Sequence, residues 1–128
     1  MILKHLALTC SSEEKSDKFY QNLLGMQKSA PKTIPPSLSK ALFDIDAELK
    51  IINYSDDRLH FEIFFTDRAK SDTRPIEHAC LEVDGLEVFL EKCRALKVTI
   101  IQAPKGDKLI TFISDNDGNL FEIKGSKS

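Results

Sequence analysis

The sequence predicts an α+β fold in which one domain is built from two βαβββ modules. Its 128 residues are enough for one domain and leave little room for a second independent core. A hairpin-like segment near the middle of the chain recurs near its end without a gap. Two strand-like segments that contain a histidine are each followed by a helix-like segment. Together these observations indicate a duplicated unit.

The recurring hairpin is the clearest part of the duplication. Residues 49–63 align with residues 109–123, and each segment reads as strand, polar turn, strand. The turns contain Asp, Asn and Gly, which favour tight hairpin turns. The identical residues are Leu49 and Leu109, Asp57 and Asp117, and the Phe-Glu-Ile tripeptides at 61–63 and 121–123.

The starts of the two modules also match. Residues 3–8 and 76–81 both alternate as strands do, with a histidine in the third position. The first helix is expected to begin near Ser11, where Ser11 and Glu14 have capping-box spacing, and to end before Gly25. The second helix is expected from Leu86 to Leu96, because its apolar residues recur at helical spacing.

The remaining elements complete each module. Strands are expected at 26–30 and 98–103, each following its helix. The first module is longer: 57 residues separate His5 from Glu62, whereas 44 separate His78 from Glu122. The extra 13 residues fall within 31–46, where 34–43 predicts an inserted helix with a proline near its start. The expected boundaries are therefore module one at 1–66, a linker at 67–75 and module two at 76–125.

Composition excludes several classes of protein. The net charge of −2 argues against a nucleic-acid-binding protein. The chain contains no apolar run of membrane-spanning length, and its N-terminus lacks the layout of a signal peptide. The three cysteines are odd in number and form no CxxC motif, which argues against a disulfide framework or a thiolate zinc site. A cytoplasmic protein is expected.

Strand alternation predicts a metal site. His5, Glu62, His78 and Glu122 each lie on the strand face opposite the apolar residues that should carry the helices. Two like sheets related by a pseudo-twofold axis would bring the four together on a concave inner face. Two imidazoles and two carboxylates suit Zn²⁺, Ni²⁺, Co²⁺, Mn²⁺ or Fe²⁺, and the ligands alone do not choose among these ions. Taken singly, each residue also fits a structural histidine or a solvated glutamate.

Three further residues share these faces and are predicted to line the pocket. They are His60, two residues before Glu62; Cys80, two residues after His78; and Lys124, two residues after Glu122. Cys80 also fits a small buried apolar residue. The segment 105–108 fits either a loop that closes over a site or an ordinary exposed turn.

The sequence resembles the vicinal oxygen chelate superfamily, which includes glyoxalase I, bleomycin-resistance proteins and extradiol dioxygenases. The resemblance covers nearly the whole chain and is strongest for glyoxalase I-like proteins. Its most specific parts are FYQNLLGM and DNDGNLFEI, in which Asn116 replaces the usual proline. The resemblance implies a U-shaped, partly open β-barrel around a central cavity with His5, Glu62, His78 and Glu122 as metal ligands. It also implies Glu122 as the catalytic base, with Glu62 as the second candidate, and a homodimer.

The function expected from this resemblance is a metal-dependent, glyoxalase-like lyase or isomerase. It would move a proton on a small substrate that binds the metal through two adjacent oxygens, including substrates that are thiol adducts. Two alternatives stay open: a metal-free protein that binds small molecules, and a metal-dependent thiol transferase. A thiol transferase would need cations around an anion-binding pocket. The candidate cations are Lys4, Lys50 and Lys124, of which only Lys124 lies on the same strand face as a predicted metal ligand.

Overall fold

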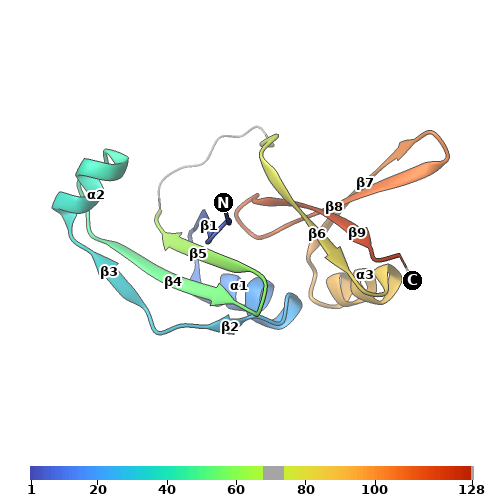
Figure 1. The fold of residues 1–128 in the computed structure, drawn as a ribbon, viewed down its shortest axis with the longest axis horizontal. Helices are drawn as coiled ribbons and strands as arrows, with labels where there is room; N and C mark the ends of the chain where they lie inside the picture. Colours follow the sequence, from blue (N-terminus) through green and yellow to red (C-terminus); the bar gives the residue numbers. More distant parts are fainter. Residues whose placement is uncertain (68–73, 128) are drawn as a thin grey trace. The chain divides into compact units, whose positions relative to one another are not determined.

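The computed structural model describes residues 1–67 and 74–127 (Figure 1). The chain forms two compact units, Met1–Ala69 and Lys70–Ser128. Each unit has its own β-sheet and at least one helix of its own. Of the expected linker at 67–75, residues 68–73 lie outside the described residues.

The sheet of the first unit has the strand order β1-β5-β4-β2, with β3 also paired to β4. The strand β1 lies parallel to β5, and β4 pairs antiparallel with β5, β2 and β3. The last strand of the unit, β5, therefore lies between β1 and β4. The strands are β1 (Leu6–Cys10), β2 (Gln27–Lys28), β3 (Lys32–Ile34), β4 (Leu49–Ser55) and β5 (His60–Phe65).

The first helix begins as α1 (Glu13–Ser16) and continues as the π-helix η1 (Asp17–Leu23). Its N-cap is Ser12, whose hydroxyl accepts a hydrogen bond of 3.2 Å from the Lys15 amide. The expected cap at Ser11 is therefore wrong by one residue, because a second serine competes for the same role. The helix ends before Gly25, whose φ of +72° is the left-handed conformation that glycine adopts without strain.

The insertion of the first module contains two elements. The helix α2 (Pro36–Phe43) begins with a proline in its first turn, where the missing amide hydrogen costs nothing. The strand β3 was not expected. It occupies the edge of β4 at Leu49–Ile51, while β2 occupies that edge at Tyr54 and Ser55. This shared edge leaves β2 shorter than the expected strand at 26–30.

An aromatic core fixes the helix to one face of the first sheet. The Tyr20 ring of η1 lies 5.3 Å from the Tyr54 ring and 5.5 Å from the Phe61 ring, measured between centroids. All three side chains are buried, as are Ile52 and Ile63 on the same face. Because side chains alternate along a strand, Asn53 and Glu62 lie on the opposite face.

A charged network lies where the helix meets the edge of the sheet. The Glu13 carboxylate accepts hydrogen bonds from Lys28 Nζ at 2.7 Å and Lys50 Nζ at 2.8 Å. These bonds lower the pKa of Glu13 from 4.5 to about 2. Lys28 also donates to Asp17, and the buried Tyr54 hydroxyl donates to Asp17 Oδ1 at 2.7 Å. Burial and this bond to a carboxylate raise the pKa of Tyr54. The network ties the first turns of the helix to β2 and β4.

The second unit has the strand order β6-β9-β8-β7, with β6 parallel to β9. The helix α3 buries Leu90 and Cys93, and the sheet buries Ile113, Phe121 and Ile123. Burial raises the pKa of the Cys93 thiol to about 11. The elements are β6 (His78–Val83), α3 (Leu86–Ala95), β7 (Thr99–Lys105), β8 (Lys108–Ser114) and β9 (Leu120–Gly125).

The two units share one topology. In both, the first strand pairs in parallel with the last strand, which pairs antiparallel with the strand before it. The repeat predicted for residues 49–63 and 109–123 corresponds to the hairpins β4–β5 and β8–β9. The α+β fold of two βαβββ modules is thus confirmed. Within the described residues, neither sheet closes on itself as a barrel.

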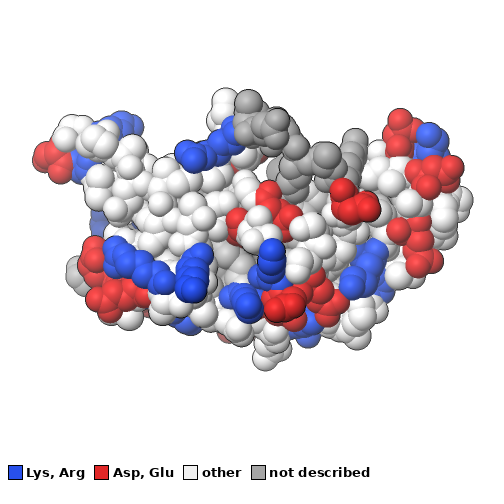
Figure 2. Space-filling view, turned by 180° about the vertical axis from the view of Figure 1, so that it is seen from behind, with Lys and Arg blue, Asp and Glu red and all other residues white. Residues whose placement is uncertain are grey.

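Acidic and basic side chains alternate over the face drawn in Figure 2 and do not separate into one basic surface. This mixture agrees with the small net charge of −2. None of the helices within 1–67 and 74–127 has the length and apolar character needed to cross a membrane.

Candidate metal and substrate site

The first unit brings His5 and Glu62 together on the face of its sheet opposite α1 and η1. Parallel pairing of β1 with β5 sets Ala7 opposite Glu62, and His5 precedes β1 by one residue. The distance from His5 Nε2 to Glu62 Oε1 is 3.8 Å. The Glu62 side chain is 19% exposed and that of His5 is 43% exposed. The predicted partners therefore meet, and the carboxylate is the more enclosed of the two.

The second unit repeats this pair. Parallel pairing of β6 with β9 sets Cys80 opposite Glu122, and His78 is the first residue of β6. The distance from His78 Nε2 to Glu122 Oε1 is again 3.8 Å. The two modules thus present the same pair of atoms at the same separation, although their sequences differ around it.

Hydrogen bonding fixes which nitrogen of His78 faces the carboxylate. His78 Nδ1 lies 2.7 Å from the carbonyl oxygen of Ile76. Because a carbonyl oxygen only accepts hydrogen bonds, Nδ1 carries a proton. In a neutral imidazole, Nε2 then presents a lone pair toward Glu122. The ring is also held edge-on by Phe112, at 4.8 Å between centroids. This is the orientation of a metal-binding histidine whose second nitrogen is anchored.

The donor set fits a divalent cation. A lone pair on Nε2 and a carboxylate oxygen repel each other at 3.8 Å unless a cation, either a proton or a metal ion, lies between them. The four residues that would hold a metal are the members of the two pairs, His5 with Glu62 and His78 with Glu122. Imidazole and carboxylate donors suit the borderline divalent ions and do not select one of them.

The other predicted pocket residues lie beside the pairs. The His60 ring centroid lies 5.8 Å from that of His5, and His60 Nε2 is buried without a hydrogen-bond partner among the described residues. Lys124 Nζ lies 4.0 Å from Glu122 Oε2, although its side chain is 66% exposed. Cys80 is exposed and not buried, so it is not the small core residue that was the alternative interpretation.

Two residues on these faces were missed by the sequence analysis. Asn53 lies opposite Glu62 on β4, and its Oδ1 is buried without a partner in the described part of the chain. Phe112 lies opposite Glu122 on β8. Strand alternation had been applied to the first and last strands of each module, which carry or adjoin the predicted ligands. The same rule applied to β4 and β8 would have found both residues.

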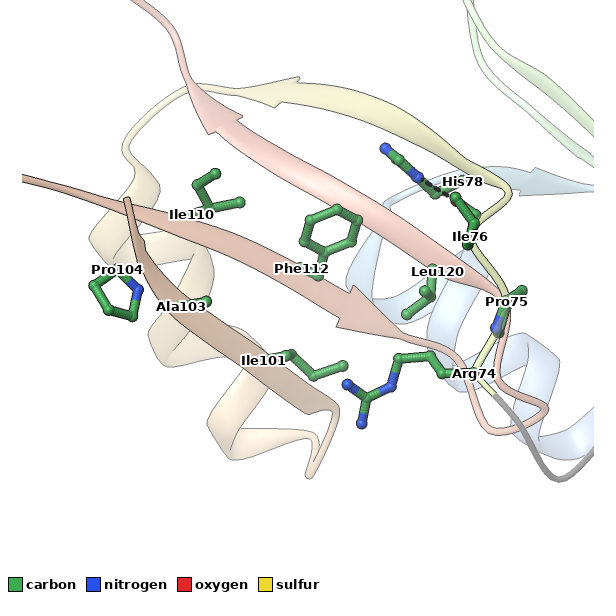
Figure 3. Close-up of a pocket in the computed structure, with 10 residues that line it drawn as sticks. All are labelled: Arg74, Pro75, Ile76, His78, Ile101, Ala103, Pro104, Ile110, Phe112 and Leu120. Atoms are coloured by element: carbon green, nitrogen blue, oxygen red, sulfur yellow. Dashed lines mark hydrogen bonds between the residues drawn. The ribbon is translucent and has the colours of Figure 1, made fainter. Parts of the chain in front are cut away.

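A cavity of about 350 Å³ opens beside His78 on the helix-free face of the second sheet. Figure 3 shows that its floor comes from neighbouring strands, with Arg74 and Pro75 at one end. Most of its surface is apolar. The lining residues are Arg74, Pro75, Ile76, His78, Ile101, Ala103, Pro104, Ile110, Phe112 and Leu120.

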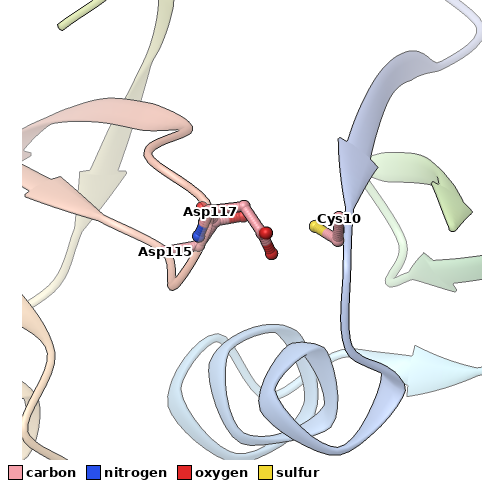
Figure 4. Close-up of side chains that lie close together, drawn as sticks. All are labelled: Cys10, Asp115 and Asp117. Atoms are coloured by element: carbon pink, nitrogen blue, oxygen red, sulfur yellow. Dashed lines mark hydrogen bonds between the residues drawn. The ribbon is translucent and has the colours of Figure 1, made fainter. Parts of the chain in front are cut away.

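The side chain of Asp115 stabilises the turn between β8 and β9. Asp115 Oδ1 accepts hydrogen bonds from the amides of Asp117 and Asn119, both at 2.9 Å, and Oδ2 accepts one from the Asn119 side chain. Figure 4 draws Asp115 and Asp117 in this turn, and also Cys10 at the end of β1. The segment 105–108 is the turn of the hairpin β7–β8.

Three solved structures have a similar fold. FosX, a fosfomycin resistance protein from Listeria monocytogenes, is 20% identical with a TM-score of 0.71, covering 99% of this chain and 94% of its own. A glyoxalase family protein from Enterococcus faecalis is 18% identical with a TM-score of 0.71, covering 95% of both chains. A mutant of Listeria FosX, complexed with Mn(II) and 1S,2S-dihydroxypropylphosphonic acid, is 21% identical with a TM-score of 0.72, covering 99% of this chain and 95% of its own.

No curated protein matches the sequence. The family model for the glyoxalase/bleomycin resistance protein/dioxygenase superfamily matches residues 2–123. This match covers both modules, including all four residues of the two His–Glu pairs. The chain therefore belongs to the glyoxalase/bleomycin resistance protein/dioxygenase superfamily, also called the vicinal oxygen chelate superfamily.

Proposed function

We propose that this chain is a metal-dependent, glyoxalase-like lyase or isomerase that moves a proton on a small substrate with two adjacent oxygens. The observation that carries the proposal is the repeated His–Glu pair, with 3.8 Å between Nε2 and Oε1 in each module. In this proposal His5, Glu62, His78 and Glu122 hold one divalent metal ion, within one chain or across a dimer.

The metal would act as a Lewis acid that stabilises the negative charge formed when a proton leaves a carbon next to a carbonyl. Glu122 is the proposed base that takes this proton on a carboxylate oxygen, and Glu62 is the second candidate. Both carboxylates are largely enclosed, at 21% and 19% exposed, which limits access of water to the proton acceptor. A positioned base contributes about 10²- to 10⁴-fold to the rate.

The histidines would position the metal and would not move protons. The Ile76 carbonyl holds the Nδ1 proton of His78, so only Nε2 is available as a ligand. His60 and Asn53 add two buried polar atoms next to the first pair, His60 Nε2 and Asn53 Oδ1, which suit contacts with a polar substrate.

A second candidate function is favoured by the likeness to FosX, which is named as a fosfomycin resistance protein. This would be a metal-dependent addition to an epoxide, with a thiol or water as the nucleophile. A phosphonate needs several cationic donors. Near the second pair, Lys124 and the pocket residue Arg74 are the cations that would bind it.

The experiment that tests the proposal measures metal content first and turnover second. Purified protein is dialysed against each of Mn²⁺, Fe²⁺, Co²⁺, Ni²⁺ and Zn²⁺, and bound metal is measured by elemental analysis before and after a chelator. Methylglyoxal is then assayed with several thiols, and fosfomycin with and without a thiol. We expect bound metal, and turnover of methylglyoxal adducts that the chelator abolishes. Binding of none of the five ions would instead favour the metal-free binding protein.

Two substitutions assign the roles. Glu122→Gln keeps an oxygen ligand, so it should retain part of the metal and lower turnover by about 10²-fold or more. Glu87→Gln, on the exposed side of α3, is the matched control and should change neither measurement. Full turnover in Glu122→Gln would remove Glu122 as the base and leave Glu62.

The proposal also includes a cytoplasmic homodimer as the active form. None of the three cysteines forms a disulfide bond in the described part of the chain, which suits a reducing compartment. Sedimentation velocity measures the oligomeric state. Mixing inactive His5→Ala chains with inactive Glu122→Gln chains restores activity only if one site draws on two chains.

A further inference from the structure

The helix-free face of the second sheet is apolar where it borders the proposed metal ligand His78. Register pairing sets Ile101 opposite Phe112 on β7 and β8, and Ala103 opposite Ile110. Ile101, Ile110 and Phe112 are each half-buried, so they are neither packed in the core nor fully solvated. These side chains line the 350 Å³ cavity together with His78. A small-molecule pocket of this size holds an aromatic ring or a branched alkyl group.

A single fixed charge borders this apolar surface. Among the ten described residues that line the cavity, Arg74 alone is permanently charged, and none is a carboxylate. Figure 3 shows the guanidinium group reaching toward the cavity on the side of Ile101. Because guanidinium groups bind carboxylates through paired hydrogen bonds, Arg74 can hold one negative charge at the end of an apolar ligand.

We infer that this cavity binds the non-reacting end of the substrate, and that this end is an apolar group bearing one negative charge, such as a carboxylate. The inference rests on the proposed function, since His78 belongs both to the cavity and to the proposed metal site. The substrate class is then an aryl or branched-alkyl monoanion whose two adjacent oxygens reach the metal. This inference disfavours the second candidate function, because one arginine among apolar side chains leaves most of the charge of a compact dianion such as a free phosphonate unpaired.

The test uses metal-free protein with methyl-labelled isoleucines and three probes. The probes are 3-phenylpropionate, which has the ring and the charge, 3-phenylpropanamide, which lacks the charge, and propionate, which lacks the ring. NMR titration follows the methyl groups of Ile101 and Ile110, with the fully buried Ile52 and Ile63 of the first sheet as references. We expect 3-phenylpropionate to shift the two pocket isoleucines, and to bind more tightly than either of the other probes.

Two variants, Arg74→Gln and Phe112→Leu, distinguish the contribution of the charge to binding from that of the apolar surface. Arg74→Gln should weaken binding of 3-phenylpropionate about tenfold and leave 3-phenylpropanamide unchanged, since one charge-assisted pair is lost. Arg58→Gln, an exposed arginine of the β4–β5 turn, is the matched control and should change neither affinity. Phe112→Leu keeps the core packed but removes the ring, and it should weaken both aromatic probes.

Several results would overturn the inference. These are equal affinity for propionate and 3-phenylpropionate, no effect of Arg74→Gln, or pocket isoleucine shifts that depend on protein concentration and not on the probe. The last result would show that a second copy of the chain covers this surface. Because the titration needs no metal, failure of the cavity inference can be distinguished from failure of the proposed function. Probe binding in a protein that takes up no metal would support the cavity and refute the metal-dependent enzyme.

Discussion

The Glu13 carboxylate should stabilise the first unit, and this stabilisation should depend on pH. Glu13→Gln removes the charge that accepts hydrogen bonds from Lys28 and Lys50. The matched control is Glu14→Gln in the same helical turn, because the Glu14 side chain is 84% exposed and its ion pair is with Lys18 on the same helix. Both variants remove one negative charge near the start of the helix, so the difference between them isolates the network.

The magnitude follows from the lowered pKa and the exposure of the partners. A fall in the pKa of Glu13 from 4.5 to about 2 corresponds to about 3.4 kcal/mol, at about 1.4 kcal/mol per pH unit. This is an upper limit, because the Glu13 side chain is 37% exposed and that of Lys50 is 42% exposed. Solvent screening of such pairs reduces the expected loss in unfolding free energy to about 1–2 kcal/mol for Glu13→Gln, and to below about 0.5 kcal/mol for Glu14→Gln.

Tyrosine fluorescence makes the measurement specific to the first unit. The chain has no tryptophan, and its two tyrosines, Tyr20 and Tyr54, are both buried there. Urea unfolding is followed at pH 7 and pH 3. Since the folded pKa is depressed, the stabilisation is complete above pH 4.5 and is lost as the pH falls toward 2. The effect of Glu13→Gln should therefore shrink to about half or less at pH 3. An equal effect at both pH values, or an effect no larger than that of Glu14→Gln, would refute this reasoning.

Two further predictions concern the second unit. At pH 8 a thiol reagent should modify the exposed Cys80 readily and Cys93 only on unfolding, because burial raises the pKa of the Cys93 thiol to about 11. Equal rates of modification of Cys80 and Cys93 in the native protein would contradict this prediction. Asp115→Ala should lower the unfolding free energy by about 1–3 kcal/mol, because the amides of Asp117 and Asn119 lose their shared acceptor. Urea unfolding followed by circular dichroism measures this, and an effect below about 0.5 kcal/mol would be too small for a bond to a buried carboxylate.

The fold was predictable where the chain repeats itself. The matching segments 49–63 and 109–123 locate the hairpins β4–β5 and β8–β9, because turn chemistry and strand alternation are both local in sequence. The insertion was less predictable. The strand β3 is held by pairing with the edge of β4. Its three residues are too few for an alternation of polar and apolar side chains to be recognised in the sequence. Ser11 and Ser12 offer the same capping chemistry, so the sequence does not decide between them.

The site was predictable to the extent that alternation sorts residues by face. The pairs of His5 with Glu62 and of His78 with Glu122 follow from this rule, together with the parallel pairing of first and last strands. Arg74 could not be found in this way. It precedes the strand β6, and its place beside Ile101 depends on the three-dimensional course of the chain.

The parallel pairing of β1 with β5 determines when the His5–Glu62 pair can form during synthesis. The edge strand β1 finds no partner until the chain beyond His60 has emerged, because β5 is the only strand beside it in the described sheet. Contacts between distant segments close slowly. The same order holds for β6 and β9, so the second pair cannot form until residues 120–125 have been synthesised. Each His–Glu pair therefore joins the first and last strands of its module, and a nascent chain cannot present either pair before that module is complete.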